Sequence, residues 1–304
     1  MRKTLFFLLL ASSAAMFAEN YTVKSPDERI LVNVETGATT TYSVTFNGKT
    51  ILNPSPLSMT FDNGVVIGRN MKVKDVQHRT EDQMLTPVVR QKSDKIRDHY
   101  NEMVLSADQY KLYFRVYDDG LAYRFHTDFA DSLKVISEEV DYCFPEDYNT
   151  LFPEERTILS AQQPLFKPMK LSEIGTDRFC STPVLIKVDD QARIFISESD
   201  LESYPGMFLK KQGKYELAGK FAAYSLEEEK TDDRQIFPTK RADYIARVSG
   251  TRNYPWRAMI VAENDANLVT NQLIYKLAPE SQGDFSWVKP GKIAWDWYNA
   301  LILT

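Results

Sequence analysis

The strongest constraint on the fold of this chain is a succession of short apolar segments separated by tight turns. Asn47-Gly48, Asp62-Asn63-Gly64 and Asp118-Asp119-Gly120 each join two such segments. Asparagine, aspartate and glycine tolerate the positive φ that tight hairpin turns require, so these turns predict antiparallel hairpins. Within the segments, as in Arg29–Glu35, apolar side chains recur at every second residue, which is the period of a strand with one buried face.

The strand pattern covers most of the chain, with two interruptions. Asp141–Thr182 contains four prolines and little periodicity, and we expect it to be a mostly irregular excursion over the surface or over a cleft. Asp265–Leu277 has a helical period, and Asp265 could cap that helix or favour its positive end. We therefore predict an all-β fold, a large antiparallel sandwich of two stacked sheets followed by one short helix.

Composition excludes some classes of function. The formal net charge is −5 and the pI is near 5.4, so the chain lacks the basic surface that nucleic-acid binding requires. No histidine and cysteine pattern with metal-ligand spacing is present. We therefore expect neither a nucleic-acid partner nor a zinc site.

The N-terminus predicts export. Residues 1–18 combine a charged start, the apolar run Leu5–Leu10 and a region rich in small residues, the pattern of a signal peptide. No later segment reaches the roughly 18 apolar residues of a spanning helix. We expect a periplasmic or secreted protein with no membrane contact after signal cleavage. Export would permit a disulfide between Cys143 and Cys180, but the sequence leaves this open.

The most suggestive chemistry lies in Trp287–Thr304. We predict a strand over Lys292–Trp297 that places Asp296 between Trp295 and Trp297. Flat aromatic rings beside a carboxylate suit a sugar, because the rings stack on the sugar face and the carboxylate accepts hydroxyl hydrogen bonds. The alternative is a buried strand with a structurally paired aspartate.

Two further groups of polar residues are candidates. Glu198, Asp200 and Glu202 follow a predicted strand and could offer oxygens to a hard cation such as Ca²⁺, but the residues alone favour a solvated acidic turn. Arg252 and Arg257 flank aromatic residues and could bind a carboxylate or sugar hydroxyls. A structurally paired arginine at the start of a strand is the alternative.

These motifs together resemble glycoside hydrolase family 97. The resemblance rests on Ile196–Leu201 with Tyr204–Leu209, on Ser249–Arg257 and on Trp287–Asn299. The family contains exported bacterial α-glucosidases and α-galactosidases. It implies an N-terminal β-super-sandwich of the galactose mutarotase type, a catalytic (β/α)8 barrel and a small C-terminal β domain.

The resemblance also sets the expected domains. A barrel needs about 250 residues, and only residues 287–304 follow Ser286. We therefore expect a signal peptide at 1–18, the super-sandwich at 19–278, and a linker with the first strand of a truncated barrel at 279–304. On this expectation the chain is an N-terminal fragment.

The family implies calcium-dependent cleavage of oligosaccharides by carboxylates located in the barrel, so we expect no catalytic residue here and no activity of this chain alone. It implies Glu198 as a calcium ligand and Trp295, Asp296, Trp297 and Arg257 as substrate-binding residues. Preference for glucosides or galactosides, and retention or inversion, stay open. The alternatives are a stand-alone carbohydrate-binding β-sandwich and a mutarotase-like epimerase, which would need a histidine and a carboxylate to converge.

Overall fold

The computed structural model describes residues 18–89, 92–231, 235–280, 282–289 and 291–293. As the turn pattern predicted, the elements are almost all antiparallel strands. In chain order the strands are β1 (Glu19–Lys24), β2 (Ile30–Thr36), β3 (Thr41–Phe46), β4 (Lys49–Phe61), β5 (Val66–Ile67), β6 (Asp75–Leu85), β7 (Ile96–Ser106), β8 (Tyr110–Tyr117), β9 (Gly120–Asp128), β10 (Leu133–Cys143), β11 (Asn149–Glu155), β12 (Phe166–Lys170), β13 (Phe179–Ser181), β14 (Val184–Lys187), β15 (Arg193–Ser199), β16 (Met207–Lys211), β17 (Glu216–Phe221), β18 (Ser225–Lys230), β19 (Ile236–Arg241), β20 (Ala246–Val248), β21 (Thr251–Asn253) and β22 (Trp256–Ala262).

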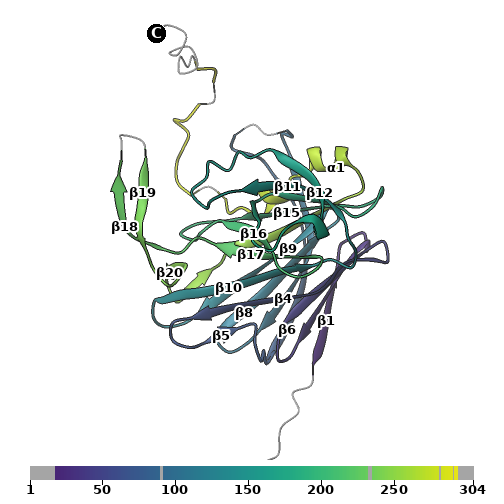
Figure 1. Cartoon of the computed structure of the whole chain (residues 1–304). Coiled ribbons are helices and arrows are strands. Elements are labelled where there is room, and N and C mark those ends of the chain that lie inside the picture. The colour runs from purple at the N-terminus through teal and green to yellow at the C-terminus, as the bar shows by residue number, and fades with distance from the viewer. Residues whose placement is uncertain (1–17, 90–91, 232–234, 281, 290, 294–304) are drawn as a thin grey trace, which may run out of the picture.

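Most of the strands pair in two series that share β11, and β18 and β19 pair only with each other among the described strands. One series runs β1-β2-β3-β4-β10-β17-β16-β13-β11, and the other runs β11-β14-β15-β22-β9-β8-β7-β6. Glu154 and Glu155 of β11 pair with β13, whereas Asn149–Leu151 pair with β14. The sheet therefore doubles back at β11 and forms the two layers of a sandwich (Figure 1).

The core lies between these layers. In β2 every second side chain is buried, and Ile30, Val32 and Val34 have no exposed surface. Aromatic contacts join the layers, since the ring of Tyr42 in β3 lies 5.2 Å from the ring of Tyr123 in β9. Each large apolar side chain buried in this way stabilises the fold by roughly 1.5–3 kcal/mol. The predicted all-β sandwich is thus confirmed.

The segment Asp141–Thr182 is more regular than the sequence predicted. It contributes the end of β10, then β11, β12, a 3-10 helix (Leu171–Glu173) and β13. Pro168 lies inside β12, which pairs only with β11 among the described strands and is therefore an edge where a missing N–H group is tolerated. The apolar side chains divide: Phe152 is fully buried, whereas Leu165 and Phe166 are exposed.

The predicted helix Asp265–Leu277 is divided into α1 (Asp265–Thr270) and α2 (Leu273–Leu277). Asn271 separates them, because its side-chain amide donates to Asp119 and its Oδ1 accepts the N–H group of Leu273. The N-cap of α1 is Asn264, and Asp265 lies in the first turn, where its charge favours the positive end of the helix, the second of its two predicted roles.

Several expectations about export and the C-terminus fall outside the described part of the chain. This applies to residues 1–17 of the predicted signal peptide and to residues 294–304, which include Ala294–Trp297 of the predicted strand Lys292–Trp297. No helix among the described residues is long and apolar enough to cross a membrane. Cys143 and Cys180 are both free thiols, so the disulfide that export would permit is absent.

Candidate functional site

Glu198 and Arg257 lie opposite each other on paired strands. The register of β15 against β22 places Glu198 directly beside Arg257. Nη1 of Arg257 donates to Oε2 of Glu198 at 2.6 Å, and the two side chains are only 1% and 7% exposed. Two residues that come from separate sequence motifs therefore meet inside the sandwich.

The structure adds a third residue, Glu138 of β10 in the facing layer. Nε and Nη2 of Arg257 donate to Oε1 and Oε2 of Glu138 at 2.8 and 2.6 Å. This is the bidentate geometry in which an arginine binds a carboxylate most strongly. We call Glu138, Arg257 and Glu198 the buried charge cluster, which joins the two layers. Its geometry matches the structurally paired arginine that the sequence left open for Arg257.

No sequence signal identified Glu138. It stands beside Glu139 in β10, and successive residues of a strand face opposite sides. Glu138 points inward and is 4% exposed, whereas the Glu139 side chain is 29% exposed and binds Arg69. Only the register of β10 in the sandwich tells the two glutamates apart.

The cluster holds two carboxylates and one guanidinium, so its fully ionised form carries one net negative charge. Burial raises the pKa of Glu198, and Arg257 opposes that shift. Burial works against the charge on Arg257 too, but the attraction of Glu138 and Glu198 outweighs it and raises the arginine pKa. The rings of Tyr204 and Phe221 lie 5.8 and 5.0 Å from the guanidinium carbon and favour the cation.

Glu198 is also held from a second direction. Its Oε1 accepts the backbone N–H group of Met207 at 2.8 Å. Gly206 lies next to the same oxygen, where a Cβ atom would come within 3.4 Å. Each carboxylate oxygen therefore accepts one hydrogen bond from the protein and retains a lone pair, which lets Glu198 bind one further partner.

The side chains of Asp200 and Glu202, the other two acidic candidates, do not join Glu198. Oδ2 of Asp200 accepts a hydrogen bond from Arg124 at 3.2 Å, and Glu202 is exposed at the surface. The expected group of Glu198, Asp200 and Glu202 around one cation is therefore not formed. Among the described residues no cluster of three or more His, Cys, Asp or Glu side chains could hold a metal ion. The described residues therefore offer Glu198 as one ligand of the expected calcium site and place no further acidic ligand beside it.

Two other predictions concern the C-terminal residues and the epimerase alternative. Trp295, Asp296 and Trp297 lie outside the described residues, so their role as substrate-binding residues stays a prediction. An epimerase would need a histidine and a carboxylate to converge. Nδ1 of His126 bonds to the side-chain oxygen of Asn253, and His99 lies opposite Asp82, whose carboxylate is bound by Arg97.

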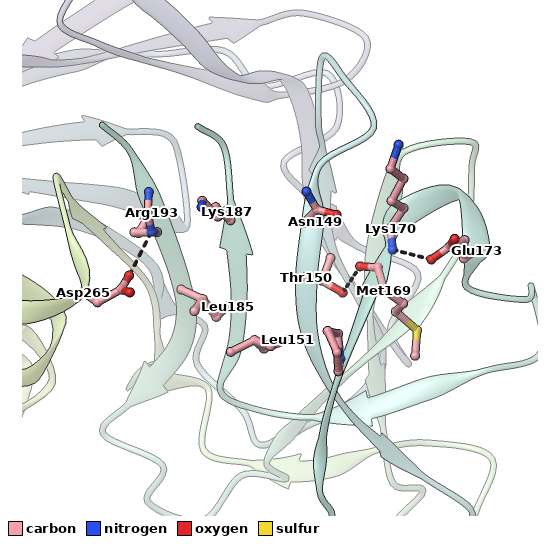
Figure 2. Close-up of a pocket in the computed structure, with 11 residues that line it drawn as sticks. Asn149, Thr150, Leu151, Met169, Lys170, Glu173, Leu185, Lys187, Arg193 and Asp265 are labelled. Atoms are coloured by element: carbon pink, nitrogen blue, oxygen red, sulfur yellow. Dashed lines mark hydrogen bonds and ion pairs between the residues drawn. The ribbon is translucent and has the colours of Figure 1, made fainter. Parts of the chain in front are cut away.

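A separate cavity of about 490 Å³ lies on the face of β11, β12, β14 and β15 (Figure 2). Cross-strand pairing places polar and basic side chains in one row over it, and an apolar row runs beside them. The polar row is Lys170, Asn149, Lys187 and Arg193, and the apolar row includes Pro168, Leu151 and Leu185. Its acidic residues are engaged, since Asp265 pairs with Arg193 at 2.9 Å and Glu173 accepts the N–H group of Lys170. The cavity therefore offers no free carboxylate pair for acid–base chemistry.

Comparison with known proteins identifies the family. The family model described as the glycosyl-hydrolase 97 N-terminal domain matches residues 23–279. A retaining alpha-galactosidase of Bacteroides thetaiotaomicron is 34% identical over 98% of this chain and 47% of its own length. A probable retaining alpha-galactosidase of Streptomyces bingchenggensis is 26% identical over 90% of this chain and 39% of its own length. The chain thus spans less than half the length of these relatives.

Solved structures share the fold. A glycoside hydrolase family 97 enzyme from Pseudoalteromonas sp. strain K8, in complex with acarbose, superposes with a TM-score of 0.76 at 22% identity, over 89% of this chain and 40% of that one. A beta-arabinopyranosidase superposes with a TM-score of 0.70 at 21% identity, over 88% and 44% of the two chains. The family match over residues 23–279 shows that this chain belongs to glycoside hydrolase family 97, to whose N-terminal domain it corresponds.

Proposed function

We propose that this chain supplies the N-terminal domain of an exported, calcium-dependent glycoside hydrolase that acts on α-galactosides or α-glucosides of oligosaccharides. Both relatives named above are described as retaining alpha-galactosidases, which favours α-galactosides and retention. Structural neighbours bind acarbose and panose, which supports an oligosaccharide substrate. The signal-peptide pattern of residues 1–18 supports export.

The observation that carries the proposal is the family match over residues 23–279. The buried charge cluster indicates what the sandwich contributes. A retaining glycosidase needs two carboxyl groups about 5–5.5 Å apart with the sugar between them. In the cluster the guanidinium of Arg257 occupies the space between Glu138 and Glu198 and binds both. The cluster is therefore built to hold Glu198 in place, and we assign the acid and nucleophile to a catalytic domain that the described residues do not include.

In this assignment the sandwich forms one wall of the active site. Glu198 supplies one oxygen ligand to calcium, and the other ligands come from the catalytic domain. A bound calcium ion would place positive charge beside the substrate and stabilise negative charge that develops there. Arg257 acts through Glu198, while Trp295, Asp296 and Trp297 line the pocket.

Hydrolysis tests the proposal. The protein to assay is the proposed longer one that includes the catalytic domain, which we call the full-length protein. With calcium present, the protein should cleave p-nitrophenyl α-galactoside or the corresponding α-glucoside, and the 304-residue chain should cleave neither. Binding of oligosaccharides by the full-length protein without turnover of either compound would refute the hydrolase and favour a carbohydrate-binding sandwich.

The calcium ligand is tested separately by Glu198→Gln in the full-length protein. The amide keeps the size of the side chain but loses the negative charge that calcium prefers in an oxygen ligand. We expect weaker calcium binding by isothermal titration calorimetry of metal-stripped protein. An unchanged dissociation constant would remove Glu198 from the ligand set.

A further inference from the structure

We propose that Glu138 is a positioning residue for the cation site. It neutralises Arg257, and this leaves the negative charge of Glu198 available to a bound cation. The inference rests on the proposed role of Glu198 as a calcium ligand. Neither Glu138 nor this role follows from any sequence motif.

The first support is that Arg257 binds the two carboxylates through unequal numbers of nitrogen atoms. Arg257 directs two nitrogens, Nε and Nη2, to the two oxygens of Glu138, but only Nη1 to Glu198. Glu138 thus forms the bidentate pair, and Glu198 makes the single contact. Because an arginine forms its strongest ion pair through two parallel N–H groups, Glu138 is its principal counter-ion.

The second support is the charge balance in a buried place. Glu138, Arg257 and Glu198 are all more than nine-tenths buried, and together they carry one negative charge in excess. In the described part of the chain, the hydrogen bonds and ion pairs of the Glu198 side chain involve one cation, Arg257. A buried negative charge without a counter-ion is costly, so the cluster favours the arrival of one more positive charge.

Removing Glu138 would change both the net charge of the cluster and the pairing of Arg257. With glutamine at position 138 the cluster would consist of one guanidinium and one carboxylate, so the excess negative charge would disappear. Arg257 would also be free to turn both N–H groups to Glu198 and occupy the lone pairs that a metal ion would use. Partners one step removed from a metal typically change its affinity about 10- to 100-fold when mutated.

Glu139 provides a matched control. It is the neighbouring residue of β10 and also binds an arginine through both carboxylate oxygens, in this case Arg69. Its side chain is 29% exposed. Among the described residues it forms no hydrogen bond with Glu198 or Arg257. Glu139→Gln therefore removes the same charge from the same strand without touching the cluster.

The experiment measures calcium affinity of the full-length protein by isothermal titration calorimetry after removal of metal, with thermal unfolding as a check on the fold. We expect Glu138→Gln to weaken calcium binding about 10- to 100-fold, and Glu139→Gln to leave it unchanged. Glu138→Asp keeps the charge and should retain most of the affinity.

The outcomes separate the inference from the proposed function. If Glu198→Gln weakens calcium binding but Glu138→Gln does not, the positioning role of Glu138 is wrong and the calcium ligand stands. If neither the parent protein nor Glu198→Gln responds to calcium, the calcium proposal is wrong and the inference falls with it. Should Glu138→Gln fail to fold, Glu138→Asp decides, because a tenfold loss of affinity with an unchanged melting temperature would contradict the charge argument.

Discussion

Replacing Arg257 with methionine measures what the buried charge cluster contributes to folding. The Arg257 side chain is 1% exposed, and its guanidinium makes three charge-assisted hydrogen bonds to Glu138 and Glu198. Methionine keeps an unbranched apolar stem but leaves two carboxylates in the core without their partner. Loss of one partner from a buried ion pair costs about 3–5 kcal/mol. At about 2–4 °C per kcal/mol for a domain of this size, the melting temperature should fall by roughly 6–20 °C.

The pH dependence has a definite sign. Burial already raises the pKa of Glu198, and the substitution removes the arginine that opposes that shift. A carboxyl group whose pKa is higher in the folded state binds more protons folded than unfolded, so stability falls as pH rises from its unfolded pKa toward its folded pKa. The loss of stability caused by Arg257→Met should therefore be large near neutral pH and smaller in acid. Thermal unfolding followed by circular dichroism at several pH values measures it.

Arg69→Met is the matched control. Arg69 binds Glu139, the neighbour of Glu138 in β10, but this pair is 36% and 29% exposed. Exposed ion pairs contribute about 0–1 kcal/mol, so this variant should lose little stability. The reasoning is refuted if Arg257→Met unfolds at the same temperature as Arg69→Met, or if its deficit grows as the pH is lowered.

Two further predictions concern other buried groups. Burial, with a smaller effect of Glu139, raises the pKa of Asp141 to about 6, so its charged form destabilises the fold above that pH. Asp141→Asn should therefore stabilise the protein by about 1–2 kcal/mol at about pH 8 and lose this advantage toward about pH 4, and a calorimetric gain that persists in acid would contradict it. Because Cys143 and Cys180 are free thiols, dithiothreitol should leave the melting temperature unchanged, and a drop on reduction would reveal a disulfide.

The local predictions succeeded where a turn or an alternating pattern specifies the backbone. Asn47 and Gly48 adopt the positive φ values of 49° and 79° expected of a tight hairpin turn between β3 and β4. The predicted sandwich followed from many such hairpins. The prediction of an irregular Asp141–Thr182 is wrong because a proline does not break a strand at the edge of a sheet, and Pro168 lies on an edge that needs no N–H group.

The candidate site was only partly visible in the sequence. Glu198 and Arg257 could be selected from their motifs, but their pairing follows from the register of β15 against β22. Glu138 and Glu139 are indistinguishable by residue type, and a shift of one residue in β10 would exchange the one that enters the core. The contacts among the selected residues therefore depend on how distant strands align.

By itself the sequence determined the all-β class, the hairpin turns and the resemblance to the family, because these depend on backbone preferences and motifs of adjacent residues. Only the tertiary structure decided that Glu138 joins Arg257 and Glu198, and that Asp200 and Glu202 do not. The physical reason is that the strong attraction between these charges exists only after the two layers exclude water around them. Which charges meet is set by the packing of strands that lie far apart in the chain.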